Sequence, residues 1–330
     1  YLAFTTLCFM SVLWSPNINY SLDQSITLLQ ISIFFFFFYN LLSDNYQFIK
    51  YLLMGLVGII YSNFIFLFYT FNLPYDLLWD NYRYQGLAEN PNTLAIQILF
   101  GFTSAILLLK DQKSTFFKIY CGLSFPIGVQ IILFTGSKKG LAGIVLYMLI
   151  LLYFISSRRN LKIANLLSIS FISLGFFWFL GNISSLYNFE ELFFNIQNRL
   201  DGLIYIEDNS TSKRLFLIMS GLEKIIQRPF FGYGIGSFNY SYSLYSHNNY
   251  IEVAYSLGLI GLLIYYNIFF NIFRTISLIK NNLNRNLFYY LLLIIPILDF
   301  ANVSYYSQLT FLIISILIVT IERTILLEQK

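Results

Sequence analysis

The stretch ITLLQISIFFFFFYNLL, residues 26–42, contains no charged residue and includes five consecutive phenylalanines, Phe34 to Phe38. An amphipathic helix repeats its apolar residues on a period of about 3.6, and a half-buried strand repeats them on a period of 2. Neither pattern is present in this stretch. A continuous apolar block close to the roughly 20 residues needed to cross a bilayer indicates a membrane-spanning helix.

Blocks of similar composition recur along the chain. Of its 330 residues, 57% are hydrophobic and only 11% are charged, whereas soluble domains usually carry about 25% charged residues. A soluble fold of this size cannot bury so much apolar surface, so we predict a single all-α, polytopic membrane domain over residues 1–330. About ten spans are expected, at residues 1–14, 26–42, 51–70, 91–109, 117–135, 141–155, 163–180, 250–272, 287–300 and 309–323.

Several other classes of protein do not fit this composition. Cys8 and Cys121 both lie in apolar blocks, without a CxxC motif or a His/Cys cluster, so neither a disulfide framework nor a structural zinc site is predicted. The net charge of +4 arises from basic residues scattered in short loops, which does not favour nucleic-acid binding. The chain begins at Tyr1 inside an apolar stretch that lacks a basic n-region and a cleavage site. We therefore expect missing N-terminal residues rather than a signal peptide.

Lysine and arginine residues in the connecting loops predict the orientation in the membrane, because short cytoplasmic loops are enriched in them. One set of loops holds most of these residues: Lys50, Lys110, Lys113, Lys118, Arg158, Arg159, Lys162, Arg274, Lys280, Arg285, Arg323 and Lys330. This set is predicted to be cytoplasmic. A long loop at residues 181–249 then lies on the extracytoplasmic side of the plasma (inner) membrane, and a loop of such length is usually functional.

Within the long loop, residues 212–228 have the spacing of an amphipathic helix. Thr211 or Ser212 is expected to cap its start. The predicted apolar face consists of Leu215, Ile218, Met219, Leu222, Ile225 and Ile226. At 100° per residue Arg214 lies at the edge of that face, whereas Lys213 points away from it. Such a helix lies along the membrane surface or packs on top of a helix bundle.

The only histidine in the chain, His247, comes at the end of the long loop, just before the span predicted at 250–272. An imidazole titrates near neutral pH, so it can accept a proton from a hydroxyl group. Asn248, Asn249 and Glu252 follow it closely. These features leave two interpretations open, a general base and an ordinary polar residue at a membrane interface.

Three glycines precede His247 in the spacing GxGxG, at Gly232, Gly234 and Gly236. A dinucleotide-binding fingerprint requires a preceding strand and a βαβ unit, and neither is expected in this chain. The glycines instead predict a tight loop whose backbone comes close to a ligand or to a neighbouring helix.

Further cations lie in loops on the same predicted side of the membrane. Arg83 lies in NYRYQGLAENPNTLA (81–95), and Lys138 and Lys139 lie in FTGSKKGLAG (134–143). There are alternatives to a phosphate site: Arg83 can be a solvated charge, and the two lysines can extend to lipid headgroups. Fixed cations can hold a diphosphate and stabilise its charge as it leaves. Together with one base, they suit the transfer of a glycan from a polyprenyl diphosphate carrier.

Residues 211–261 resemble the O-antigen ligase and Wzy-type polysaccharide polymerase family. The family pattern begins with an arginine at the start of a surface helix, here Arg214, followed by a PxxGxGxGxF-like turn, here residues 229–238. It continues with an HN pair, here His247 with Asn248, and a glycine-containing span, here with Gly258 and Gly261. TGSKKG and RYQGLAENPN match more weakly, and Lys138 stands where the family usually has arginine.

The resemblance implies a GT-C-like, metal-independent and cofactor-free glycosyltransferase that uses undecaprenyl-diphosphate-linked oligosaccharides. It implies that His247 is the base on the acceptor hydroxyl or orients that hydroxyl, and that Arg214 is a second catalytic residue, which binds diphosphate. The residues it implies in diphosphate or substrate binding are Arg83, Lys138, Lys139, Asn248, Gly234 and Gly236. Membrane lipids, a chain-length regulator and a flippase are the other expected partners.

Two alternative functions remain open at this point. A ligase would transfer the glycan to another lipid or to a protein, and a transporter or flippase would move it. Transporters carry ionisable residues within their spans and use broken helices. Here the spans contain almost no ionisable residues at mid-span: Asp299 lies near a span end and Glu252 near a helix start, and no helix broken at the midplane is expected.

Overall fold

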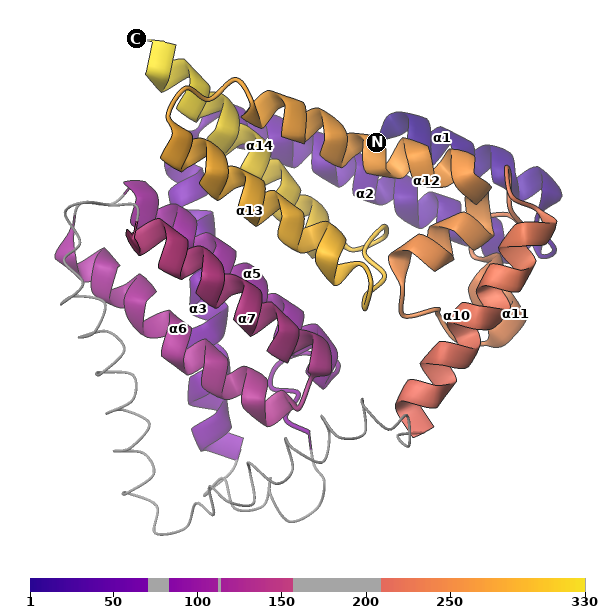
Figure 1. Cartoon of the computed structure of the whole chain (residues 1–330), viewed down its shortest axis with the longest axis horizontal. Helices are drawn as coiled ribbons and strands as arrows, with labels where there is room; N and C mark the ends of the chain where they lie inside the picture. Colours follow the sequence, from indigo (N-terminus) through magenta and orange to yellow (C-terminus); the bar gives the residue numbers. More distant parts are fainter. Residues whose placement is uncertain (71–82, 112–113, 157–208, 330) are drawn as a thin grey trace. The chain divides into compact units, whose positions relative to one another are not determined.

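The computed structural model describes residues 1–70, 83–111, 114–156 and 209–329 (Figure 1). Over these ranges the chain is helical and forms no strand, so the all-α prediction is confirmed for the described residues. The chain divides into two compact units, which we call unit 1 (Tyr1–Tyr46 and Ile206–Lys330) and unit 2 (Gln47–Tyr205). The expectation of one membrane domain stays a prediction.

Unit 1 contains both ends of the described chain. Its first helix, α1, is followed directly by a 3-10 turn, η1, and packs against both α2 and α12, while α14 packs along α2 (Figure 1). Its elements are α1 (Leu2–Ser11), η1 (Val12–Trp14), α2 (Ile18–Asp44), α10 (Asn209–Gln227), α11 (Ser237–Tyr242), α12 (Asn249–Ile276), α13 (Asn282–Leu298) and α14 (Gln308–Gln329).

Asparagine residues start three helices of unit 1. The side chain of Asn17 accepts a hydrogen bond from the backbone N–H of Tyr20 at the start of α2, and Asn248 accepts one from Ile251 at the start of α12. Asn281 does the same for α13. A side-chain acceptor at this position satisfies an N–H group that the helix itself leaves unpaired. The residue after His247 therefore marks the beginning of α12.

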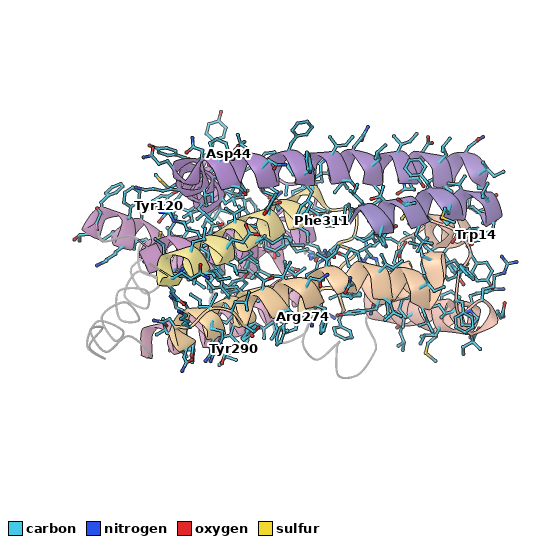
Figure 2. The ribbon with its side chains drawn as sticks, turned by 90° about the horizontal axis from the view of Figure 1, so that it is seen from above. Trp14, Asp44, Tyr120, Arg274, Tyr290 and Phe311 are labelled. Atoms are coloured by element: carbon cyan, nitrogen blue, oxygen red, sulfur yellow. The ribbon has the colours of Figure 1, made fainter. Side chains whose placement is uncertain are left out.

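Aromatic rings fill much of the core of unit 1. Phe311 on α14, labelled in Figure 2, is buried, and its ring centroid lies 4.3 Å from that of Tyr1. Phe4 on α1 is also buried and lies 5.2 Å from the ring of Tyr265 on α12. Tilted aromatic pairs at such separations are favourable beyond the area that they bury.

Unit 2 is built around α5. Its elements are α3 (Tyr46–Thr70), α5 (Pro91–Asp111), α6 (Thr115–Thr135) and α7 (Lys138–Ser156). Both α6 and α7 pack against α5 (Figure 1). As predicted, Pro91 occupies the first position of its helix, where its missing N–H is not needed. Gly136, with φ of 55°, ends α6 in the left-handed conformation and leads directly into α7.

Six of the described helices are long and apolar enough to cross a membrane: Ile18–Asp44, Gln47–Leu67, Pro91–Lys110, Thr115–Thr135, Asn249–Ile276 and Gln308–Gln329. Helices also form at three other predicted spans, as α1 with η1, α7 and α13. Of these, α7 has 19 residues, α13 has 17 and α1 with η1 covers only Leu2–Trp14, so all three are shorter than the roughly 20 that a span needs. The predicted count of about ten spans is therefore not confirmed. The span predicted at 163–180 and the loop residues 181–208 lie outside the described residues.

The expectation that no helix is broken is wrong. Inside α12, Gly258 has φ of 67° and ψ of −169°, which interrupts the helix. The segment after α10 fits into the break: the N–H groups of Tyr233 and Gly234 donate to the carbonyls of Tyr255 and Ser256, at 2.9 and 2.7 Å. Bonds to another segment replace the missing intrahelical bonds. The spacing of apolar residues does not report on such bonds, so it did not predict the break.

Candidate active site

The turn between α11 and α12 holds His247 in an uncommon backbone conformation. Its φ is 59°, and Ser243 in the same turn has φ of 54°. Within the described ranges these are the two non-glycine residues with positive φ. Residues other than glycine rarely adopt this conformation unless the surrounding structure imposes it, and such residues often lie at functional sites.

Buried polar groups on both sides of His247 impose that conformation. The backbone N–H of Ser246 donates to Oε2 of Glu252 at 2.7 Å. The Ser246 hydroxyl donates to the carbonyl of Asn248 at 2.6 Å and accepts from the N–H of Asn248 at 3.1 Å. Ser246 is fully buried and Glu252 is only 2% exposed. The turn is thus fixed by residues immediately before and after the histidine.

Tyr245 lies against the imidazole of His247, with ring centroids 4.0 Å apart and ring planes at 51°. Burial raises the pKa of Tyr245, the positive charge of Arg214 partly offsets that rise, and the negative charge of Glu252 adds to it. Arg214 and Glu252 are therefore both within electrostatic reach of Tyr245. Tyr245 thus contacts His247 directly and senses the charge of Arg214, the two residues predicted to be catalytic.

α10 carries Arg214 and begins earlier than predicted, at Asn209. The expected caps, Thr211 and Ser212, lie inside the helix, so that prediction is wrong. α10 ends at Gln227, just before Pro229, in agreement with the predicted end near residue 228. The earlier start leaves Arg214 in the second turn of the helix, where it is half-buried.

The face by which α10 packs also differs from the prediction. The buried face contains Leu217, in a cluster with Phe238, Ile251 and Tyr255. Of the predicted apolar face, Ile218 and Ile225 pack against this cluster, whereas Leu215, Met219, Leu222 and Ile226 are exposed. Gly221 explains the difference, because a Cβ there would come within 2.7 Å of the Ile251 side chain. Close approach to α12 occurs on the glycine side, and counting apolar residues does not reveal this.

Asn249 ties the start of α12 to the segment that follows α13. Its backbone N–H donates to the carbonyl of Asp299 at 2.8 Å, and its side-chain N–H donates to the Asp299 carboxylate at 3.2 Å. Its side-chain oxygen accepts from the N–H groups of Ser304 and Tyr305, at 2.9 and 3.1 Å. This buried clamp holds the helix start next to His247 in place.

Gly234 packs against the connection between α1 and α2, and Gly236 packs against the start of α2. A Cβ at Gly234 would lie 2.9 Å from the carbonyl oxygen of Ser11, and one at Gly236 would lie 2.9 Å from the ring of Tyr20. Trp14 in the same connection donates from its indole to the carbonyl of Phe231 at 3.2 Å; its position is labelled in Figure 2. Close approach to a neighbouring element accounts for both glycines, and their contact with a substrate stays a prediction.

In unit 2 the structure brings Arg83 to the hairpin between α6 and α7. Nε of Arg83 donates to the carbonyl of Thr135 at 2.8 Å, and Nη2 donates to Oδ1 of Asn92 at 3.0 Å. The hydroxyl of Ser137 donates to the same oxygen of Asn92 at 2.9 Å. Two loops that the sequence could not relate are therefore in direct contact.

Lys138 and Lys139 are the first two residues of α7, and both are half-buried. The Ser137 hydroxyl accepts a hydrogen bond from the N–H of Gly140 at 3.3 Å, as a residue that caps a helix does. The N-terminus of a helix carries partial positive charge and attracts anions. With Arg83 attached to the same hairpin, this end of α7 is strongly cationic.

The predicted site residues therefore form two groups, each within one unit. Unit 1 holds Arg214, Gly234, Gly236, His247 and Asn248, and unit 2 holds Arg83, Lys138 and Lys139. Over the ranges that the structure describes, no three His, Cys, Asp or Glu side chains gather as a metal site would require.

Three residues of the site had no assigned role in the sequence analysis: Tyr245, Glu252 and Asp299. A signal existed for the two carboxylates, because ionisable residues close to apolar spans are often functional. No signal existed for Tyr245, one of 27 tyrosines in the chain. Only its contact with His247 distinguishes it from the others.

Comparison with known proteins identifies a family that part of the chain resembles. A family model described as O-antigen ligase matches residues 123–266, which include the hairpin before α7 and the whole of the segment from α10 to the middle of α12. The resemblance stated from the sequence is confirmed over these residues. A search of curated proteins found no match to the chain.

Proposed function

We propose that the protein is a membrane glycosyltransferase that polymerises undecaprenyl-diphosphate-linked oligosaccharide repeat units into capsular or O-antigen polysaccharide. The match of residues 123–266 to the O-antigen ligase family model supports this proposal. The proposed architecture is GT-C-like with about ten spans. The proposed location is the plasma (inner) membrane, with the active site on the extracytoplasmic face. Proposed partners besides the substrate and membrane lipids are a chain-length regulator and a flippase.

The observation that carries this proposal is the group formed by Arg214, Tyr245 and His247. The imidazole of His247 packs at a tilt against a tyrosine that is within electrostatic reach of an arginine. Glycan transfer from a diphosphate carrier needs these two functions, a group that accepts a proton and a cation that binds the leaving diphosphate. Arg214 is suited to the second because its planar guanidinium can form paired hydrogen bonds with phosphate oxygens.

In the proposed reaction His247 accepts the proton of the acceptor sugar hydroxyl. The hydroxyl oxygen forms a bond to the anomeric carbon of the donor as the bond from that carbon to the diphosphate breaks. The bonding electron pair leaves with undecaprenyl diphosphate, whose negative charge Arg214 stabilises. Attack opposite the leaving group inverts the anomeric configuration, and the reaction uses no metal ion.

Arg83, Lys138 and Lys139 form a second group proposed to bind diphosphate. The fixed guanidinium of Arg83 beside the cationic start of α7 supports this role. Lys138 and Lys139 carry compact charges and lack the paired donors of arginine. Their contribution is therefore expected to be less dependent on the orientation of the phosphate.

Purified protein supplied with one substrate, the undecaprenyl-diphosphate-linked repeat unit, tests the polymerase directly. In buffer with EDTA, a polymerase should produce a ladder of products spaced by one repeat and release undecaprenyl diphosphate. The new linkage should have the configuration opposite to that of the donor. Retention of configuration would exclude the one-step reaction, and activity that depends on added magnesium or manganese would exclude metal independence.

The role of His247 is tested by His247→Ala, with Leu244→Ala in the same turn as the control. Loss of a positioned base should lower the rate by about 10²–10⁴-fold, whereas Leu244, which is 49% exposed, should tolerate the change. Rates are compared at equal amounts of folded protein. Normal polymer length and amount from His247→Ala would reject the assignment.

A ligase that transfers the glycan to another lipid or a protein is the second candidate, because the matching family model carries that description. A ligase would give no ladder until a second acceptor is added. Transport is less well supported by the break in α12. In transporters the freed backbone groups of broken helices bind substrate. Here the carbonyls of Tyr255 and Ser256 already accept hydrogen bonds from the N–H groups of Tyr233 and Gly234.

A further inference from the structure

Glu252 makes an unusual backward contact. It lies in the first turns of α12, and its carboxylate Oε2 accepts a hydrogen bond at 2.7 Å from the backbone N–H of Ser246, the residue before His247. The side chain is 2% exposed. A buried carboxylate is costly unless hydrogen bonds compensate it, so this contact needs an explanation.

Capping of α12 does not explain it. Asn248 already caps the helix by accepting from the N–H of Ile251 at 3.1 Å. In a capping box an acidic side chain returns to the N–H of the cap residue itself. Glu252 reaches further back and bonds to a residue that lies outside the helix, on the far side of His247.

What the contact does is fix the backbone on which His247 sits. His247, with φ of 59°, lies between two residues that are fixed by hydrogen bonds. The N–H of Ser246 donates to Glu252, and the Ser246 hydroxyl donates to the carbonyl of Asn248 at 2.6 Å. Removal of the carboxylate would leave a buried N–H without a partner, which strongly favours rearrangement of the turn. A small displacement of a base is enough to slow proton transfer substantially.

We propose that Glu252 is a positioning residue, which holds the turn so that the His247 imidazole keeps its orientation against Tyr245. This inference rests on the proposed function of His247. Glu252 acts through its hydrogen bond to Ser246 and does not itself contact the substrate.

Two replacements of similar size separate the hydrogen bond from simple packing. Glu252→Gln keeps an oxygen acceptor for the Ser246 N–H and should retain at least a third of the wild-type kcat. Glu252→Leu fills the space without an acceptor and should lower kcat by about 10- to 100-fold, the equivalent of a lost buried hydrogen bond. KM for the lipid-linked substrate should stay within about twofold in both, because neither change alters a residue proposed to bind it.

Glu223→Leu, at an exposed carboxylate on α10, is the matched control and should leave kcat and KM unchanged.

The single histidine of the chain provides a second measurement that does not depend on activity. Protein with isotope-labelled histidine, purified without a histidine tag, should give one set of imidazole NMR resonances. We expect these resonances to be retained in Glu252→Gln and to shift or broaden in Glu252→Leu.

Unchanged resonances and unchanged kcat in folded Glu252→Leu would overturn the positioning role. A raised KM with normal kcat would also overturn it, because that result indicates a role in substrate binding. Failure of the proposed function looks different: His247→Ala would then be fully active, whatever Glu252→Leu does to the resonances.

Discussion

Arg214, Lys213 and Lys224 lie on the same helix but in different environments. Arg214 is half-buried and influences Tyr245, whereas both lysines are exposed on α10. Exposed charges on a helix contribute little beyond a general, screened attraction. A cation that is partly buried can instead interact with one phosphate at a fixed position.

Substitutions at Arg214 should therefore have graded effects. Arg214→Ala is expected to lower kcat/KM by about 10²–10³-fold, as removal of one donor to a developing negative charge does. Arg214→Lys keeps the charge but loses the planar pair of donors, so its activity should be intermediate. The measurement is the initial rate of polymer formation by purified variants.

Lys213→Ala and Lys224→Ala serve as matched controls on the same helix, and we expect their rates to stay close to wild type. Equal losses in all four variants would indicate a general requirement for positive charge and would contradict a specific site at Arg214.

Among the secondary-structure elements, α12 is the one whose geometry the site depends on. Its start carries Glu252 and follows His247, its first residue is clamped to the segment after α13, and its break receives the segment after α10. The last two of these contacts join parts of the chain that are far apart in sequence. The position of His247 therefore depends on a helix that is broken at one defined residue.

Gly258→Ala tests the importance of that break. An L residue with φ of 67° and ψ of −169° is strained, at a cost of about 1–3 kcal/mol. In addition, a Cβ would lie 2.2 Å from the backbone of Phe230. We expect a clearly lower midpoint of thermal unfolding and loss of activity.

Gly55→Ala in α3 provides the control, because a Cβ there has open space around it. Alanine within a helix is favoured over glycine by roughly 0.5–1 kcal/mol, so its midpoint should be unchanged or raised. A Gly258→Ala protein as stable as wild type would show that the break is not needed.

Across the whole molecule, orientation in the membrane is the property on which the proposed function most depends. Undecaprenyl-diphosphate-linked repeats are polymerised on the extracytoplasmic side in this proposal, so α10 must lie on that side. The native cysteines, Cys8 and Cys121, are buried in the structure. Introduced cysteines can therefore report on exposure once these two are replaced.

Glu223→Cys on α10 should react with an impermeant thiol reagent in intact cells. Lys280→Cys, in the loop after α12, should react only after lysis. Both positions are exposed in unit 1, so accessibility depends on the side of the membrane. Labelling of Lys280→Cys and protection of Glu223→Cys in intact cells would invert the predicted topology and exclude an extracytoplasmic site.

Composition alone was sufficient to predict the helical class, and local sequence was sufficient to predict most helix positions. Lipid-facing helices need continuous apolar blocks, and helix ends need capping groups, so both leave direct marks in the sequence. The start of α5 at Pro91 and the end of α10 before Pro229 are examples. His247 and Arg214 were identifiable because one is a unique residue and the other belongs to a recognisable motif.

Tertiary structure alone decided which face of α10 is buried, where α12 breaks and which side chains surround His247. Leu217 and Gly221 rather than Met219 face α12, because a glycine permits the closest approach of two helices. The break at Gly258 is stable because a distant segment supplies the missing hydrogen bonds. Tyr245 and Glu252 acquire their roles through contacts across a turn. The packing of α10 and the break in α12 depend on the positions of several elements at once, and the contacts of Tyr245 and Glu252 depend on an uncommon backbone conformation at His247, so an apolar pattern does not reveal them.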